Sequence, residues 1–338
     1  MRTILRRLTK MEKLICLGIE STAHTFGVGV VDGKGTILAN EKDSYTTEKG
    51  GIHPSEAKEH HLRVKDRVVD DALRKASLSL KDIDLVSFSQ GPGLAPCLIV
   101  GRDKAAEISK EIKKPIIGVN HCISHLEIGK LMTKAKDPVL LYVSGANTQV
   151  IAYDGGKYRI FGETLDIGIG NFLDTFARHI GIGFPGGPKI AELASKGRNY
   201  IELPYVVKGM DVSFGGLLTN LKQKSDSGKY SKEDLAYSLQ ETSFAMLVEV
   251  SERAMAHCEK NDLLLGGGVA CNKRLQEMCK KMCEERDAKC FIPPADVLID
   301  NGAMIAWQGI LQRKQATKNY DIDIRSYERT DDVEVEWR

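Results

Sequence analysis

The sequence has almost no excess charge of either sign. Its 338 residues include 48 Lys and Arg against 46 Asp and Glu, which gives a formal net charge of +2. Proteins that bind nucleic acid by themselves usually carry a clear basic excess or a basic patch. We therefore expect any contact with RNA to be local or shared with partner proteins.

Paired cysteine motifs and long apolar runs are also lacking. None of the eight cysteines forms a C-x-x-C pair, which predicts a reduced, cytoplasmic protein. No apolar run reaches the about 18 residues that a membrane-spanning helix requires, so we expect no membrane association. The basic residues 1–10 precede too short an apolar stretch for a signal peptide, and we expect them to form a loose N-terminal extension.

What the sequence does contain is one α/β pattern used twice. The apolar segments 14–20 and 26–31 flank a polar turn, and the segments 139–143 and 149–153 repeat this arrangement. In each half, a later apolar strand runs into a glycine-rich turn and then a helix. This order is typical of an α/β unit. The sequence therefore predicts a duplicated α/β fold.

The length of the chain and its duplication predict two lobes. We expect a nucleotide in the cleft between them, held by backbone amides and hydroxyls of the hairpin turns. The alternative is that the glycines only form turns. The expected divisions are an N-terminal α/β lobe at 11–135, a C-terminal α/β lobe at 136–302, a helix at 303–320 with the option of packing back on the first lobe, and a peripheral charged tail at 321–338.

Two histidines are spaced for metal binding. Asn120 follows an apolar segment and can cap a helix whose first turns carry His121 and His125. Residues four apart share a helix face, so the two imidazoles can bind one divalent metal and leave room for a carboxylate, a phenol or substrate. Asp300 ends an apolar run just before a helix and is a candidate third ligand. A packed or solvated pair is the alternative.

Cys122 follows the first of these histidines, where the H-E-x-x-H motif of zinc proteases has its catalytic glutamate. A thiol cannot act as that general base at neutral pH. The sequence therefore gives no support to protease chemistry.

A second histidine pair, His60 and His61, is adjacent in a predicted helix. Neighbouring helical residues are about 100° apart around the axis, so we do not expect the two to chelate one metal as a pair spaced by four would. At most one of them is expected to face a site, and an exposed or packed role is the alternative.

Asp174 ends the stretch 166–174, which places acidic groups and glycines together, and precedes the apolar glycine loop 183–188. Such loops let a ligand approach the backbone. The carboxylate could bind ribose hydroxyls or a phosphate-bound Mg²⁺, or it could simply cap a helix. Five lysines near a polar stretch could meet phosphate, or form a solvated face: Lys208, Lys222, Lys224, Lys229 and Lys232.

Taken together, the motifs resemble those of the universal threonylcarbamoyladenosine synthase family, called TsaD in bacteria and found as the catalytic subunit of the KEOPS complex in archaea and eukaryotes. The similarity extends over about residues 13–335. The ordered blocks that carry it are GIESTAHT at 18–25, QGPG at 90–93, NHCISH at 120–125, YVSG at 142–145, GFPGGP at 183–188, GGVA at 267–270 and DNGAM at 300–304. The first turn and the block 56–61 resemble the archaeal and eukaryotic branch.

The resemblance implies an actin, Hsp70 and sugar-kinase type of fold and a tRNA-modifying transferase. It implies four ligands for one divalent metal, iron or zinc, namely His121, His125, Tyr142 and Asp300. It implies a site for threonylcarbamoyl-AMP, in which ATP could also bind, with Mg²⁺ as an optional ion. The residues implied to bind the nucleotide or substrate are Tyr142, Val143, Ser144, Gly145, Ala146, Asp174, Gly187 and Asn272. Gly267 and Gly268 are implied to lie alongside it. Partners implied are tRNA, the small KEOPS kinase and the other small KEOPS subunits.

Three positions depart from the family pattern. Ala146 stands where the family usually has a second glycine, which adds a methyl group close to the ligand. Ala191 replaces the acidic residue expected to contact the ribose, and Glu192, one position later, is a candidate for that contact. The segment 53–56 lacks the basic residue that usually follows its proline.

The reaction implied is transfer of threonylcarbamoyl to the N6 amine of adenosine 37 in tRNA, with release of AMP. The metal and backbone amides would stabilise developing charge. No side chain is an obvious nucleophile, so we expect no covalent enzyme intermediate. The alternatives are a kinase of the same two-lobed superfamily, a regulatory ATPase or DNA-binding chromatin factor, and a metalloprotease.

Overall fold

The structure is a computed structural model and describes residues 12–47 and 51–338. The predicted extension 1–10 lies outside the described residues. The chain forms two compact units. The first comprises the described residues of 1–45 together with 53–131 and 300–338, and the second comprises the described residues of 46–52 together with 132–299.

The first unit contains a five-stranded sheet in the order β3-β2-β1-β4-β5. Its strands are β1 (Ile15–Glu20), β2 (Thr25–Asp32), β3 (Ile37–Ser44), β4 (Leu85–Gly91) and β5 (Ile116–Asn120). Its helices are α2 (Pro54–Ala76), α3 (Ala95–Ile112), α4 (His121–Met132) and α11 (Gly302–Leu311), with short 3-10 turns at Leu80–Asp82, Arg313–Gln315 and Thr330–Asp332.

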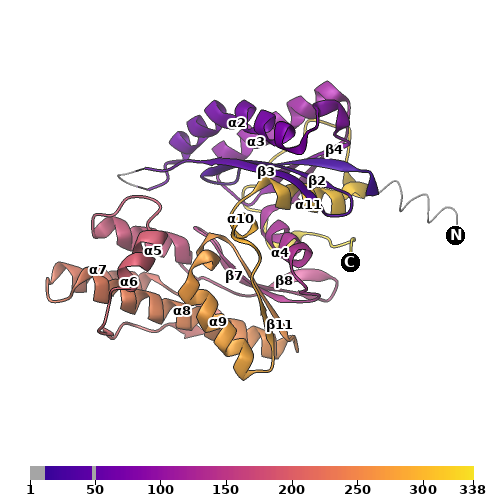
Figure 1. Cartoon of the computed structure of the whole chain (residues 1–338). Helices are drawn as coiled ribbons and strands as arrows, with labels where there is room; N and C mark the ends of the chain where they lie inside the picture. The colour runs from indigo at the N-terminus through magenta and orange to yellow at the C-terminus, as the bar shows by residue number, and fades with distance from the viewer. Residues whose placement is uncertain (1–11, 48–50) are drawn as a thin grey trace. The chain divides into compact units, whose positions relative to one another are not determined.

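Strands β1, β4 and β5 run parallel to one another, whereas β2 and β3 are antiparallel additions. Helices α2 and α3 cover one face of this sheet, and α11 covers the other (Figure 1). Because parallel strands end at the same edge, the last residue of β1, Glu20, and the last residue of β5, Asn120, lie at one edge. Helix α4 begins there.

Two glycines allow α11 to pack directly on the sheet backbone. A Cβ atom added to Gly18 would lie 2.2 Å from the amide nitrogen of Ala306, and one added to Gly29 would lie 2.1 Å from that of Ala303. Any side chain at either position would push α11 away. The close packing fixes the N-terminal end of α11, which begins two residues after Asp300.

The segment after Tyr320 runs along the first unit without forming a strand. Its backbone exchanges hydrogen bonds with the end of β4, from Arg325 to Gln90 and from Gly93 to Ser326. Near its end, Trp337 donates from Nε1 to Glu127 on α4 at 2.9 Å. The charged tail thereby contacts the helix that carries the histidine pair.

The second unit contains a five-stranded sheet in the order β12-β11-β6-β7-β8 and a small β10-β9 ribbon. Its strands are β6 (Val139–Val143), β7 (Thr148–Asp154), β8 (Lys157–Glu163), β9 (Val207–Lys208), β10 (Asp211–Val212), β11 (Asp262–Gly266) and β12 (Lys289–Phe291). Its helices are α5 (Ile169–His179), α6 (Gly187–Ala194), α7 (Gly215–Asp226), α8 (Lys232–His257), α9 (Lys273–Glu285) and α10 (Ala295–Leu298), with a 3-10 turn at Gly268–Cys271.

The predicted duplication is confirmed by the strand orders. Read from its other edge, the second sheet runs β8-β7-β6-β11-β12, which matches β3-β2-β1-β4-β5 strand by strand. The pairing directions agree as well, because β6 is antiparallel to β7 and parallel to β11, as β1 is to β2 and β4. The fold is therefore a duplicated α/β fold.

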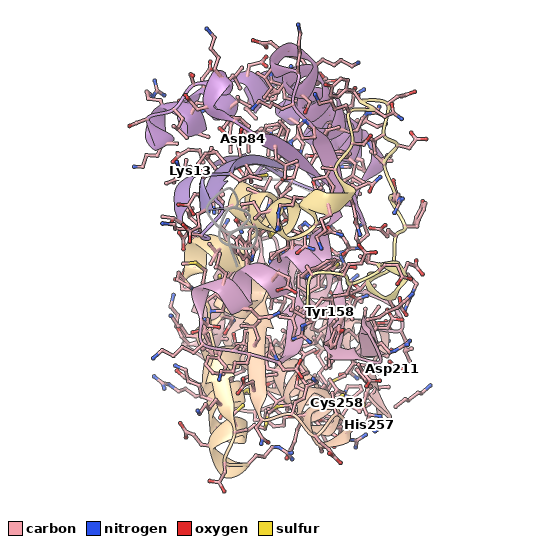
Figure 2. All side chains as sticks on the ribbon, turned by 90° about the vertical axis from the view of Figure 1, so that its right-hand side faces the viewer. Lys13, Asp84, Tyr158, Asp211, His257 and Cys258 are labelled. Carbon is pink, nitrogen blue, oxygen red and sulfur yellow. The ribbon has the colours of Figure 1, made fainter. Side chains whose placement is uncertain are left out.

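Helix α8 crosses the core of the second unit and ends beside β8. Its last residue, His257, and the residue that follows, Cys258, are labelled in Figure 2. The ring of His257 meets that of Phe161 with centroids 5.6 Å apart. On the same sheet, the rings of Tyr153 and Tyr158 meet edge to face at 5.5 Å. Most of the buried apolar residues of this unit form one core cluster.

Candidate metal centre and nucleotide-binding turns

Helix α4 begins immediately after β5, so its first residue, His121, lies at the edge where the parallel strands end. The side chain of Asn120 accepts a hydrogen bond from the amide of Ile123 at 3.2 Å, as expected for a residue that caps the helix. His121 and His125 are one helical turn apart and only 3% and 2% exposed. Both imidazoles are therefore held in a dry environment.

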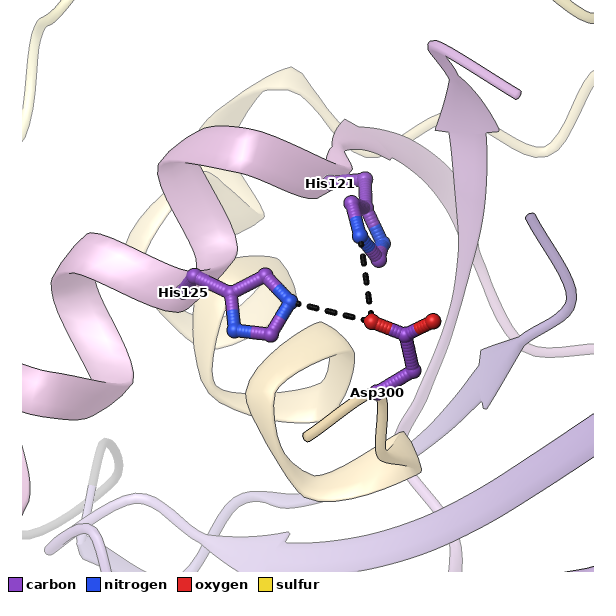
Figure 3. A group of neighbouring side chains, drawn as sticks. All are labelled: His121, His125 and Asp300. Carbon is purple, nitrogen blue, oxygen red and sulfur yellow. Dashed lines mark hydrogen bonds and ion pairs between the residues drawn. The ribbon is translucent and has the colours of Figure 1, made fainter. Parts of the chain in front are cut away.

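The two imidazoles converge on one carboxylate oxygen. Nε2 of His121 lies 3.4 Å from Oδ1 of Asp300, and Nε2 of His125 lies 3.2 Å from the same atom (Figure 3). The three donor atoms lie within 4.8 Å of one another. Within residues 12–47 and 51–338, no other group of three or more His, Cys, Asp or Glu side chains brings its donor atoms this close.

The protonation states in this cluster suit metal binding. Burial by itself would raise the pKa of the Asp300 carboxyl, but charge interactions and hydrogen bonds with His121 and then His125 hold it well below its ordinary value. Burial lowers the pKa of His125, against the opposing effect of Asp300. An ionised carboxylate and a neutral imidazole are the forms that bind a divalent cation.

Behind His121 lies a buried carboxylate that the sequence reasoning did not assign to the site. Oε2 of Glu20 lies 2.9 Å from Nδ1 of His121, and Oε1 accepts from the amide and the hydroxyl of Thr22 at 2.7 and 2.5 Å. The Glu20 side chain is fully buried. The only sequence signal for it is an acidic residue at the end of an otherwise apolar strand.

The second histidine pair takes a different arrangement. His60 and His61 lie on α2 and are both buried. Nε2 of His60 contacts Asp43 at 2.8 Å, and the Nδ1 atoms of the two rings are 3.4 Å apart. Burial, followed by the charges of His60 and His24, lowers the pKa of His61 to about 3. The pair is packed against β2 and β3.

Cys122, which follows His121 on α4, is buried, and burial raises the pKa of its thiol to about 11. The thiol is therefore protonated at neutral pH. This position cannot supply the general base of a zinc protease.

In the second unit, the residues expected to bind nucleotide form a turn at the end of β6. Tyr142 and Val143 are buried within the strand, whereas Gly145 and Ala146 are exposed in the turn that follows. The amide of Gly170 donates to the carbonyl of Ser144 at 3.0 Å, and that of Asn171 donates to Gly145 at 2.9 Å. The start of α5 thus holds this turn in place.

The turn after β11 packs against the end of β6. Gly267 has a φ of 90°, and a Cβ atom there would lie 2.3 Å from the carbonyl oxygen of Val143. Gly268, which follows it, is exposed. Asn272 then caps α9 by accepting from the amides of Arg274 and Leu275. The structure therefore brings Val143 and Ser144 together with Gly267 at neighbouring strand ends, and Asn272 begins the helix that follows.

Asp174 lies on α5 and contacts the glycine loop rather than standing free. Its Oδ1 accepts from the amides of Gly186 and Gly187 at 2.7 and 3.3 Å, which fixes the start of α6. Glu192, predicted as a substitute ribose contact, is exposed and pairs with Lys196 at 2.8 Å. Asp174 is thus well placed to shape the loop, while Glu192 is engaged on the helix surface.

Comparison with known proteins decides the family. The family model described as tRNA N6-adenosine threonylcarbamoyltransferase (TsaD) matches residues 36–307. A tRNA N6-adenosine threonylcarbamoyltransferase of Thermococcus kodakarensis is 58% identical over 326 residues, which cover 96% of this chain and 100% of that relative. The chain belongs to this family.

This chain is also similar to a longer protein and to a solved structure. A probable bifunctional tRNA threonylcarbamoyladenosine biosynthesis protein of Methanothermobacter thermautotrophicus is 53% identical, over 96% of this chain and 61% of that protein. Among solved structures, HypF of T. kodakarensis superposes with a TM-score of 0.62 at 16% identity, over 91% of this chain and 48% of that one. At such identity the structural match shows the fold alone.

The predicted family and fold class are confirmed, and the chain is a transferase that modifies tRNA, as its family is. This membership also answers the alternatives of a kinase, a regulatory ATPase or chromatin factor, and a metalloprotease, since the matching family is none of these. Among the described residues, no helix is both long and apolar enough to cross a membrane.

Proposed function

We propose that the chain acts as the catalytic subunit that transfers threonylcarbamoyl from threonylcarbamoyl-AMP to the N6 amine of adenosine 37 in tRNA. In this reaction the amine forms a bond to the carbamoyl carbonyl carbon, the bond to the phosphate oxygen breaks, and AMP leaves. The observation that supports this proposal most is the convergence of two buried imidazoles and a carboxylate in a member of this family.

We propose His121, His125 and Asp300 as ligands of one divalent metal, zinc or iron. Two imidazole nitrogens and one carboxylate oxygen match the donors that both metals accept, and three protein ligands leave positions open for substrate. Tyr142, the fourth predicted ligand, belongs to the second unit and stays a prediction from the resemblance. When bound, such a metal supplies a Lewis acid for the carbonyl oxygen.

The nucleotide half of the substrate is proposed to bind the turns of the second unit. The exposed turn Ser144–Ala146 offers backbone groups at a strand end, next to Gly267 and Asn272. Asp174 would act mainly by holding the amides of Gly186 and Gly187 in position. ATP, with Mg²⁺ on its phosphates, would use the same turns.

We propose direct attack of the amine, without a covalent enzyme intermediate. Cys122 is the cysteine next to a proposed ligand, and its raised pKa keeps it a poor nucleophile. The role of the chain's side chains is then to orient the two substrates and to hold the metal. Isolation of a carbamoylated side chain during turnover would contradict this proposal.

The proposed partners are tRNA, the small KEOPS kinase and the other small KEOPS subunits, in the cytoplasm. The near-zero net charge of +2 supports shared RNA binding, because a single chain of this charge lacks a strong field for phosphates. The relative whose printed name is bifunctional is longer than the region matched here. That supports a second component acting beside this chain.

The test is a reconstitution with partner subunits, threonylcarbamoyl-AMP and unmodified tRNA, followed by digestion and mass spectrometry of the nucleosides. The expected result is threonylcarbamoyladenosine with the wild-type chain and none with His121→Ala plus His125→Ala. His179→Ala is a suitable control, since His179 pairs with Asp226 in the second unit. Absence of the modified nucleoside with the wild-type assembly would refute the proposed function.

A further inference from the structure

We infer that Glu20 is a positioning residue for His121, and that it selects the imidazole tautomer able to bind metal. This inference rests on the proposed metal site. In the hydrogen bonds described above, Glu20 contacts neither Asp300 nor His125, and its hydrogen bond to the cluster is the one to the His121 ring.

The topology of the first unit brings the two residues together. Glu20 is the last residue of β1, and His121 directly follows β5, which lies two strands away in the same parallel set. The shared edge of these strands places Oε2 of Glu20 2.9 Å from Nδ1 of His121, although the residues are 101 positions apart. Both side chains are buried, so water cannot replace either partner.

The contact determines which imidazole nitrogen carries the proton. A carboxylate only accepts hydrogen bonds, so Nδ1 of His121 must donate to it. In the neutral ring, which is the form that binds metal, the lone pair is then on Nε2, the atom 3.4 Å from Oδ1 of Asp300. A carboxylate that receives the far N–H of a metal-binding histidine fixes its ring orientation and makes it a stronger ligand.

A carboxylate is needed because both of its oxygens are engaged. Oε1 accepts from the amide and hydroxyl of Thr22, and Oε2 accepts from His121. Glutamine has the same shape but one acceptor and one NH₂ group. If its carbonyl faces Thr22, its NH₂ faces Nδ1 of His121, which moves the ring proton to Nε2 and blocks that ligand atom.

The competing explanation is that Glu20 only stabilises the turn at Ser21–Thr25. A matched control is available in Glu127, a buried glutamate of the same unit that accepts from Trp337 and Lys130 at 2.9 Å. Glu127→Gln also neutralises a buried acid. It leaves the bond between Glu20 and His121 intact.

The experiment titrates Co²⁺ into the metal-stripped full-length chain and follows the visible absorption of bound cobalt against a competing chelator. For Glu20→Gln we expect a dissociation constant about 10- to 100-fold higher than that of the wild type, with a changed cobalt spectrum. For Glu127→Gln we expect the wild-type value and spectrum. Thermal unfolding of the metal-free chains is measured in parallel.

Equal weakening in the two variants, or wild-type affinity in Glu20→Gln, would overturn the inference. If Glu20→Gln does not fold, Glu20→Asp replaces it, since the shorter side chain draws the carboxylate away from Nδ1 of His121. A several-fold weaker Co²⁺ affinity then supports the inference, and an unchanged affinity overturns it. Failure of the wild-type chain to bind Co²⁺ at all would refute the metal site itself, not only the role of Glu20.

Discussion

The first unit carries two buried histidine pairs, and only one of them has the geometry of a metal site. On α4, His121 and His125 direct their Nε2 atoms at one oxygen of Asp300. On α2, the adjacent His60 and His61 bring their Nδ1 atoms to 3.4 Å from each other. The pairs have similar burial and the same chemistry, so the difference lies in where the ring nitrogens point.

The surrounding carboxylates explain why the pairs differ. Asp300 is held in place by the start of α11 and contacts both imidazoles of its pair. Asp43 contacts only His60, and it is also paired with Arg67. The charge of the Asp43 carboxylate is therefore already balanced by the guanidinium of Arg67. For metal binding, the spacing of the two histidines therefore matters less than a carboxylate that contacts both imidazoles and is not paired with an arginine.

The largest expected effect is on metal content, which substitutions in the α4 pair should lower and a substitution in the α2 pair should not. Replacing His121 and His125 together by alanine should weaken metal binding by at least about 100-fold, because loss of an outer partner alone costs about 10- to 100-fold. His60→Ala should retain stoichiometric metal. Elemental analysis of the purified chains checks this, and metal retained by the double variant would reject the ligand assignment.

The next effect compares the two carboxylates. Asp300→Asn removes the negative charge from the donor set, and we expect its metal dissociation constant to rise by about 10-fold or more, a change of about 1.4 kcal/mol. Asp43→Asn is the matched control and should leave metal affinity unchanged. Equal affinities of the two variants in a chelator competition assay would remove the distinction between the pairs.

The second pair, His60 and His61, should make the stability of the folded chain depend on pH. The pKa of His61 is lowered to about 3 in the folded chain, so the unfolded chain binds the proton first as the pH falls below 6.5. The contribution of His61 is therefore present at neutral pH and is lost progressively between pH 6.5 and about 3, by about 2 kcal/mol at pH 5.

Chemical denaturation of the metal-free chain at pH 7 and pH 5 measures this loss. His61→Phe, which keeps an aromatic ring beside Phe26, should reduce the difference between the two pH values. The same pH dependence in His61→Phe as in the wild type would show that other groups cause it.

The smallest expected effect concerns Asp43. Asp43→Ala removes the acceptor for His60 and the partner of Arg67, and should lower the free energy of unfolding by about 1 kcal/mol, since Asp43 is partly exposed. Urea denaturation measures it. A change in metal content in this variant would mean that the two pairs are coupled.

Much of the fold could be predicted because its signals are local. The apolar segments 14–20 and 26–31 correspond to β1 and β2, and the segments 139–143 and 149–153 correspond to β6 and β7. The duplication was visible because both hairpins keep the same order of apolar runs and turns. The short elements at 207–212 carry too few residues to give a periodic signal.

The site was predictable only in part, because its contacts are long-range. The spacing of His121 and His125 predicts a shared helix face, and Asp300 was a candidate because it precedes a helix. The role of Glu20 depends on the pairing of parallel strands 101 residues apart in sequence. The contact between His60 and His61 depends on side-chain rotamers, which their separation around the helix does not determine.

The most direct test of the metal centre is X-ray absorption spectroscopy on the zinc-loaded full-length chain. The account predicts nitrogen and oxygen neighbours at about 2.0–2.2 Å with the outer scattering of two imidazoles, and of one imidazole in His125→Ala. A sulfur neighbour at about 2.3 Å, or an imidazole count unchanged by His125→Ala, would contradict it.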